Sequence, residues 1–169
     1  MNWFRLITIT LFLVGCGEAD RGKAYITSQE GSISIIDLNK MEVVGQLKAG
    51  SYPRGIGITN DGKRIITANK AEASITVTNK ISNEIESSIE VGINPEFVRV
   101  FNDQVFVSTE PSSKGKPPAK GEMHKEEDDD DDDRTPAKIA VVDLAEGKKI
   151  REITAGPETE GIEFSKDGK

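Results

Sequence analysis

The sequence predicts an all-β fold built from a four-stranded unit that recurs along the chain. Short runs rich in Val, Ile and Thr alternate with Gly, Asn, Asp and Pro from residue 24 onward. This alternation is typical of strands joined by tight turns. The 169 residues are enough for one domain.

The period is about 40 residues. Ile26-Thr-Ser-Gln aligns with Ile66-Thr-Ala-Asn at a shift of 40, and Gly50-x-x-Pro53 aligns with Gly92-x-x-Pro95 at a shift of 42. Four short strands in such a period are typical of a β-propeller blade, so we expect an incomplete propeller of about three four-stranded antiparallel blades. The residues expected to have a structural role in the repeat are Gly50, Pro53, Gly55, Asp61, Gly62, Gly92, Pro95, Gly156, Gly161, Asp167 and Gly168.

These residues resemble the YVTN-type β-propeller repeat. The matching segments are Tyr25-Ile-Thr-Ser, Ile35-Ile-Asp37, Ala49-Gly-Ser-Tyr-Pro-Arg-Gly55 and Thr59-Asn-Asp-Gly-Lys63, and the pattern returns at Val141-Val-Asp-Leu144 and Ser165-Lys-Asp-Gly-Lys169. The middle copy departs from the pattern at Val77-Thr-Asn79 and Asn102-Asp-Gln104. The resemblance implies a ring of seven blades, roughly 280 residues long. We therefore expect this chain to be the amino-terminal part of a longer protein.

The strands are predicted in the order of the repeat. They are Ala24–Thr27, Ser32–Asp37, Val43–Leu47, Gly55–Thr59, Arg64–Ala68, Ser74–Thr78, Glu84–Ile89, Phe97–Phe101, Gln104–Ser108, Lys138–Asp143, Lys149–Thr154 and Gly161–Ser165. Gly55–Thr59, Phe97–Phe101 and Gly161–Ser165 are expected to be innermost. Asp37 and Asp143 recur at one place per blade and are expected to accept turn N–H bonds rather than act as acids.

The amino terminus is predicted to be a lipoprotein signal. Residues 1–15 combine one early arginine with an apolar run too short to span a bilayer, which suits a secretion signal. The run ends in Leu13-Val14-Gly15-Cys16, which resembles a bacterial lipobox, and this implies lipidation of Cys16. The alternative is an ordinary signal with an unrelated cysteine. Residues 16–22 would form a tether, and Gly17 favours outer-membrane sorting in a periplasm-facing cell-envelope location.

The third unit contains an insertion at about residues 110–137, which we predict to be disordered. Residues 122–133 carry a net charge of −8, so the rest of the chain is close to neutral at +1. The chain has no basic stripe to indicate a nucleic-acid partner. The acidic run suits a hard cation such as Ca²⁺, the other interpretation being a solvated, self-repelling loop. The weak candidate metal ligands are His124, Asp128, Asp129, Asp130, Asp131, Asp132 and Asp133.

The sequence favours a non-catalytic binding or scaffold module. The only histidine is His124 and the only cysteine is Cys16, and no nucleophile–base motif is present. We expect no resident cofactor, with Ca²⁺ as the open alternative. We expect the protein to contact the membrane through its lipid anchor. The ligand or protein partner is not defined by any motif. The alternative, which rests on the resemblance, is a lactonase-like hydrolase or a redox-accessory propeller associated with a haem or quinone enzyme.

Overall fold

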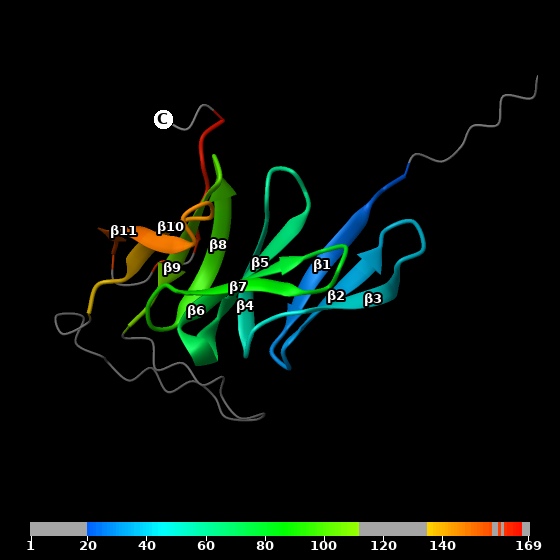
Figure 1. Cartoon of the computed structure of the whole chain (residues 1–169), viewed down its shortest axis with the longest axis horizontal. Coiled ribbons are helices and arrows are strands. Elements are labelled where there is room, and N and C mark those ends of the chain that lie inside the picture. The colour runs from blue at the N-terminus through cyan, green and yellow to red at the C-terminus, as the bar shows by residue number, and fades with distance from the viewer. Residues whose placement is uncertain (1–19, 112–134, 157–158, 160, 167–169) are drawn as a thin grey trace, which may run out of the picture.

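The computed structural model describes residues 20–111, 135–156, 159 and 161–166 (Figure 1). These residues form eleven strands and one 3₁₀ turn, so the predicted all-β class is confirmed. The elements are β1 (Lys23–Ser28), β2 (Ser32–Asp37), β3 (Glu42–Lys48), β4 (Pro53–Ile58), β5 (Arg64–Asn69), η1 (Lys70–Glu72), β6 (Ser74–Asn79), β7 (Ile85–Glu90), β8 (Pro95–Phe101), β9 (Gln104–Thr109), β10 (Lys138–Asp143) and β11 (Lys148–Thr154).

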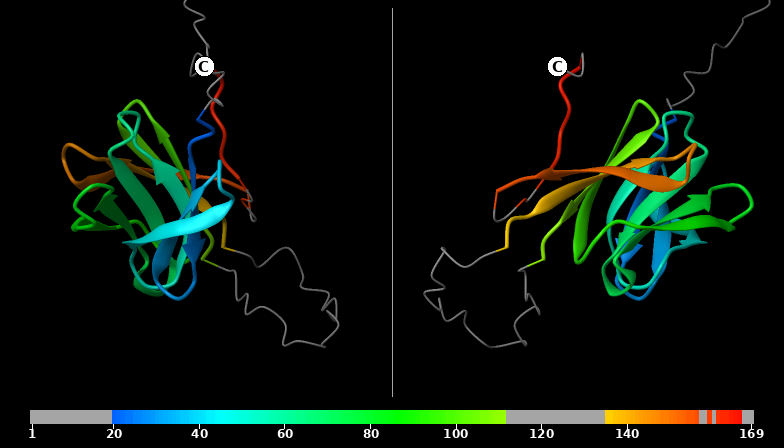
Figure 2. Two further views of the ribbon diagram at one scale, coloured as in Figure 1. Left: turned by 90° about the vertical axis from the view of Figure 1, so that its right-hand side faces the viewer. Right: turned by 60° about the vertical axis from the view of Figure 1, so that its left-hand side comes forward.

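The strands form three antiparallel sheets, in each of which consecutive strands are neighbours. Blade 1 contains β1–β3, blade 2 contains β4–β7 and blade 3 contains β8–β11. The blades stand side by side in an arc with blade 2 in the middle (Figures 1 and 2). β4 packs against β1 of the preceding blade and against β8 of the following blade. This is the arrangement of consecutive blades in a propeller.

One predicted strand is absent from the described structure. Each of the other predicted strands overlaps an observed one, with ends that differ by at most two residues. Gly161–Ser165 is not assigned as a strand, and no strand of the three described sheets pairs with it. A strand needs a hydrogen-bonded neighbour, and this segment is held by side chains instead. Phe164 stacks on Phe101 with ring centroids 4.7 Å apart and meets the edge of Phe106 at the same distance.

The structure also corrects the alignment of β1 with β5. Ile26 lies opposite Ser34, and Thr67 lies opposite Thr76. Ser34 and Thr76 each hold the third position of their strand, so Ile26 corresponds to Thr67 and not to Ile66. The shift at β1 is therefore 41 and not the expected 40. The strands after it are shifted by 42, and the connection after β5 is one residue longer than the connection after β1. A one-residue slip turns every side chain to the opposite face of the sheet.

Two buried clusters hold the blades together. The cluster between blades 1 and 2 has Ile33, Leu47 and Ile65 as its buried members. The cluster between blades 2 and 3 contains Ile66, Ala68, Ile75, Val77, Ile89, Val91, Val98, Val105, Val107, Ala140 and Val142. Burying each side chain of this kind stabilises the fold by about 1.5–3 kcal/mol. The larger cluster therefore makes blades 2 and 3 the most strongly joined pair.

The inner strands of blades 2 and 3 also meet directly through their backbones. A Cβ added at Gly55 would overlap the carbonyl oxygen of Glu96 and lie 2.9 Å from the Cα of Phe97. Only glycine allows this approach of β4 to β8. The Arg54 guanidinium pairs with the Glu96 carboxylate at 2.8 Å beside the same contact.

The last residue of the strand before the outermost one caps the following turn in every blade. This residue is Asp37, Asn79 or Asp143, and its Oδ1 accepts the backbone N–H groups two and three residues further on at 2.8–3.2 Å. The structural role predicted for the two aspartates is confirmed. Asn79 departs from the repeat pattern in charge but makes the same bonds, because its amide oxygen replaces a carboxylate oxygen.

Two surface carboxylates are held in their charged forms by neighbouring donors. The Thr59 hydroxyl donates to Asp61 at 2.6 Å and lowers the pKa of that carboxyl. The Asn79 amide and then the Arg64 guanidinium donate to Glu86 and lower its pKa in the same way. Gly62, which follows Asp61, has a φ of 68°, the left-handed conformation expected at an Asp-Gly turn.

Candidate binding groove

One side of the arc carries the connections 29–31, 49–52, 70–73 and 91–94, and we call it the loop face. Pro53 and Pro95 begin β4 and β8 on this face and are both buried. The residues that flank the insertion are on it too, because the Glu110 N–H donates to Asn94 at 3.2 Å and the Ala137 N–H donates to Gly156 at 3.1 Å. Residues 112–134 themselves lie outside the described structure.

A groove of about 890 Å³ opens on the loop face between blades 1 and 2. Its walls come from the connections 29–31, 49–52 and 72–73 and from the outer part of β6 and β7. The polar side chains that line it are Gln29, Glu30, Ser51, Tyr52, Glu72, Ser74, Thr76, Ser88 and Glu90. The groove is large enough for a small organic ligand.

Glu72 joins the two sides of the groove. Its Oε1 accepts the Ser51 hydroxyl at 2.8 Å, and its Oε2 accepts the Ser74 hydroxyl at 3.5 Å. Ser88 of β7 in turn donates to Ser74 at 3.3 Å. A carboxylate and three hydroxyls therefore line one continuous polar wall. The Glu72 carboxylate and the Ser51 and Ser88 hydroxyls have acceptor capacity left for a ligand, whereas Ser74 already accepts from Ser88 and from the Asn69 amide.

A buried amide supports this wall from below. Asn69 is fully buried, accepts the Thr67 hydroxyl at 3.0 Å and donates to the Thr76 hydroxyl at 2.5 Å. A Cβ added at Gly50 would overlap the Asn69 amide and lie 2.7 Å from Glu72 Oε2. The glycine of the Gly50-x-x-Pro53 motif is therefore needed here for space, and it lets the loop lie against the amide and the carboxylate.

The lining chemistry favours ligands that donate hydrogen bonds or carry positive charge. Glu30, Glu72 and Glu90 line the groove, and no lysine, arginine, histidine or cysteine is among its lining residues in the described part of the chain. Across residues 20–111 and the other described positions, no group of three or more His, Cys, Asp or Glu side chains is placed to hold a metal ion.

Several predicted site residues lie outside the described structure. These are Cys16, His124, Asp128–Asp133, Asp167 and Gly168. Gly156 and Gly161 are described, and a Cβ added at either would meet nothing within 4 Å. In the described residues, no helix is long and apolar enough to cross a membrane.

The groove residues were not among the site residues predicted from the sequence. The available signal was the substitution of polar for apolar residues at matching blade positions. Thr67 and Thr76 of blade 2 hold the places of Val107 and Ala140 in blade 3. Buried hydroxyl groups need hydrogen-bond partners. Here the Thr67 and Thr76 hydroxyls both bond to the Asn69 amide, which lies below the groove.

No protein-family model matches this chain, and no curated protein matches it. Solved structures match it clearly. Hydrazine synthase from Kuenenia stuttgartiensis superposes with a TM-score of 0.69 at 19% identity over 88% of this chain and 37% of that one. The WD40 domain of coronin from Toxoplasma gondii gives a TM-score of 0.56 at 8% identity over 82% of this chain and 32% of that one.

A third match is the structure of U3-55K, with a TM-score of 0.56 at 11% identity over 80% of this chain and 37% of that one. The chain thus spans about a third of the length of the structures it matches. Identities this low show the fold alone, and the fold they show is the β-propeller.

Proposed function

We propose that this protein is a non-catalytic binding or scaffold module of the bacterial cell envelope, held at the membrane through lipid on Cys16. The observation that carries the binding role is the groove on the loop face, where one carboxylate and three hydroxyls form a continuous wall over a buried amide. The propeller-fold neighbours support the same class of function. The lipobox-like segment that ends at Cys16 supports the envelope location.

The ligand of the groove is a polyhydroxylated or cationic small molecule. The lining carboxylates accept hydrogen bonds and attract positive charge, whereas an anionic ligand would meet Glu30, Glu72 and Glu90. Charge-assisted bonds to a carboxylate are the stronger ones available in the groove. Glu72 would make the central contact because it is already oriented by Ser51 and Ser74.

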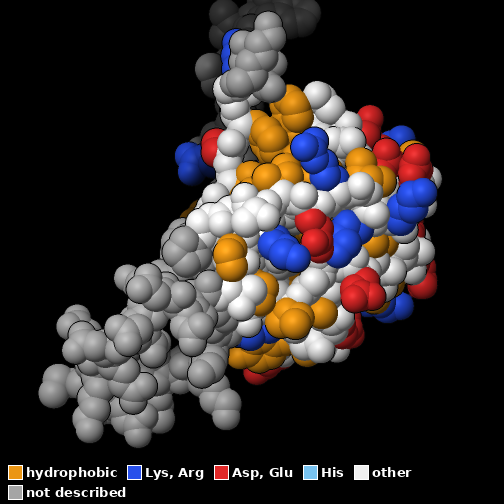
Figure 3. Space-filling view, turned by 90° about the vertical axis from the view of Figure 1, so that its left-hand side faces the viewer, with side chains coloured by type: hydrophobic (Ala, Val, Ile, Leu, Met, Phe, Trp, Pro, Cys, Tyr) orange, Lys and Arg blue, Asp and Glu red, His pale blue; other side chains and the backbone are white. Residues whose placement is uncertain are grey.

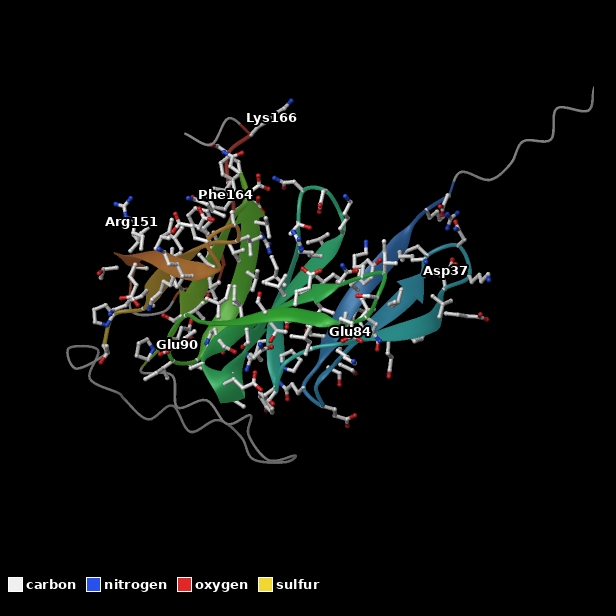
Figure 4. The ribbon with its side chains drawn as sticks, in the orientation of Figure 1. Asp37, Glu84, Glu90, Arg151, Phe164 and Lys166 are labelled. Carbon is white, nitrogen blue, oxygen red and sulfur yellow. The ribbon has the colours of Figure 1, made fainter. Side chains whose placement is uncertain are left out.

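The binding role is tested by isothermal titration with spermidine and with maltotriose as separate probes at constant ionic strength. We expect saturable binding of at least one probe, and about a tenfold loss of affinity in Glu72→Gln because a charge-assisted hydrogen bond is removed. Glu84→Gln is the matched control, because Glu84 is not among the lining residues of the groove and immediately precedes β7, at the other end of that strand from Glu90 (Figure 4). Absence of binding by both probes, or equal losses in the two variants, would contradict the proposal.

The anchor is tested by cell fractionation of the wild type and Cys16→Ser. We expect the wild type in the membrane pellet and the serine form in the soluble fraction, because several buried acyl chains are needed for stable anchorage. A serine form that stays in the pellet as the wild type does would refute the lipid anchor. It would leave the groove proposal standing, because the two experiments use different residues.

The second candidate has two versions. One is a redox-accessory propeller associated with a haem or quinone enzyme, and the other is a lactonase-like hydrolase. The observation that favours the redox version is the hydrazine synthase neighbour, whose identity to this chain exceeds that of the two other matches reported above. Titration with haem separates the candidates. A stoichiometric shift of the haem absorption band would favour the redox-accessory role, and an unchanged spectrum would favour the binding module.

A further inference from the structure

The hydrogen bonds beneath the groove run in a fixed direction that begins at Glu72. An ionised carboxylate only accepts hydrogen bonds, so Ser74 uses its single proton to donate to Glu72 Oε2 at 3.5 Å. Ser74 can therefore only accept from its other neighbours. It accepts from Ser88 at 3.3 Å and from the Asn69 amide at 3.5 Å.

This direction determines which atom of the buried Asn69 amide faces β6. The amide nitrogen donates to Ser74 and, at 2.5 Å, to Thr76, while the amide oxygen accepts the Thr67 hydroxyl at 3.0 Å. The reverse orientation would place the amide oxygen against Ser74, which has no proton left to donate. The nitrogen therefore lies on the β6 side, and Asn69 fixes Thr76 as an acceptor.

Thr76 accepts from Asn69 and keeps its own proton. It donates no hydrogen bond to any residue in the described part of the chain. Thr76 is only 1% exposed but lines the groove, and it lies opposite Ser88, another lining residue, across β6 and β7. A buried hydroxyl needs a partner for its proton. A molecule in the groove would supply the acceptor that this proton lacks.

This network belongs to blade 2 and is not a general feature of the repeat. Among the three described blades, only blade 2 has an amide at the position of Asn69, because Ser28 and Thr109 hold that place in the other two. In blade 3 the neighbouring strand begins with Lys138, which pairs with Glu152 at 3.2 Å. Figure 3 shows basic and acidic side chains next to one another on the side that carries blade 3. The groove has a different chemistry, with carboxylates and hydroxyls and no lining cation in the described residues.

We propose that the groove binds a neutral saccharide and that Thr76 is the residue that selects this ligand class. The inference rests on the binding role proposed above for the groove. A sugar hydroxyl both donates and accepts, so one sugar ring can donate to Glu72 and accept the proton of Thr76. Asn69 is a positioning residue, because it acts on the ligand only through the direction that it gives to Thr76.

A cationic ligand does not match the base of the groove. An ammonium group has three donors and no acceptor, so it leaves the Thr76 proton without a partner. The carboxylates of Glu30, Glu72 and Glu90 would attract a cation, but all three residues are exposed, and water and salt screen their charge. The hydrogen-bond match at the buried base therefore decides between the two ligand classes.

The ligand class is tested by isothermal titration of the full chain, purified in detergent, with maltotriose, cellotriose and spermidine at constant ionic strength. We expect saturable binding of at least one trisaccharide. We expect spermidine to bind at least about fivefold more weakly than the better trisaccharide, because it leaves a buried donor unpaired. A smaller difference, or tighter binding of spermidine, would overturn the saccharide inference and leave the binding role standing. Absence of binding by all three probes would overturn both.

The role of Thr76 is tested with Thr76→Val and Thr76→Ser. We expect Thr76→Val to bind the trisaccharide about fivefold more weakly, which corresponds to the loss of one neutral hydrogen bond, and to bind spermidine no more weakly than the wild type does. Thr76→Ser keeps a hydroxyl, so its affinity for the trisaccharide should stay within about twofold of the wild type. A Thr76→Val protein that binds the trisaccharide as the wild type does, or a serine form as weak as the valine form, would overturn the proposal.

Thr67→Val is the matched control. It makes the same chemical change at a residue that is 0% exposed and bonds to the same amide, but that is not among the lining residues of the groove. We expect its affinity for the trisaccharide to stay within about twofold of the wild type, because Ser74 still fixes the orientation of Asn69. Equal losses in the two valine variants would show that the network only supports the fold, and would overturn the proposal. Circular dichroism checks that each variant is folded, and if Thr76→Val does not fold, the comparison of probes on the wild type and the result for Thr76→Ser decide.

Discussion

Replacing Ile66 by alanine should strongly destabilise the protein. Ile66 is 0% exposed and lies in the larger cluster, between blades 2 and 3. Truncation of a fully buried isoleucine removes its transfer free energy and leaves a cavity, which together cost about 2–5 kcal/mol. At about 2–4 °C per kcal/mol for a chain of this size, the melting temperature should fall by roughly 4–20 °C.

The measurement is thermal and urea unfolding followed by circular dichroism, at one protein concentration for all variants. Ile81→Ala is the control, because it makes the same chemical change at a side chain that is 88% exposed. We expect its free energy of unfolding to stay within about 0.5 kcal/mol of the wild type. The packing of blade 2 on blade 3 would be refuted if Ile66→Ala were as stable as the wild type. It would also be refuted if both variants lost the same free energy of unfolding.

Three further predictions concern the turns, the surface carboxylates and the insertion. Asn79→Ala should lower the free energy of unfolding by about 1 kcal/mol or more in urea titrations, because the turn loses its two backbone bonds to the amide oxygen; an unchanged midpoint would contradict the capping role. The lowered pKa values of Asp61 and Glu86 mean that the unfolded chain binds more protons, so their stabilisation is present at neutral pH and is lost as the pH falls below about 4. Asp61→Asn should flatten that part of the pH profile, and an unchanged acid slope would count against it. Deleting residues 112–134 should leave the melting temperature nearly unchanged, since loop-length costs grow slowly, and calcium should shift neither form more than sodium at matched ionic strength; a saturable calcium shift lost on deletion would show that the acidic run is a specific site.

Most of the fold was predictable because local sequence features specify the strands and turns of the repeat. The turns at Asp61-Gly62 and after Asp37 are specified by local backbone chemistry, and the strands between them by β-branched residues. The register of β1 was not predictable from residue identity. Ile26 and Ile66 share a neighbouring threonine, but the longer connection after β5 places them on opposite faces.

The candidate site was largely hidden because it depends on contacts across blades. Gly50 was identified as a repeat residue, but its contact with Asn69 and Glu72 is visible only when β3, β4 and β5 are placed together. Likewise, the sequence of Gly161–Ser165 predicts a strand, but whether the segment forms one depends on a partner strand that the local sequence does not specify. Local signals specify elements, whereas sites and strand partners are decided by the arrangement of the blades.

The most direct test of the account is hydrogen exchange of the wild-type protein, resolved to individual strands by mass spectrometry. The central claim is that blade 2 is a rigid support, packed on blade 3, for the groove on the loop face. The account predicts the slowest exchange in β5, β6 and β9, most of whose residues are buried, and fast exchange in the exposed outer strands β3 and β11. Exchange in β5 and β6 as fast as in β11 would contradict the claim, because the floor and wall of the groove would then have no rigid support.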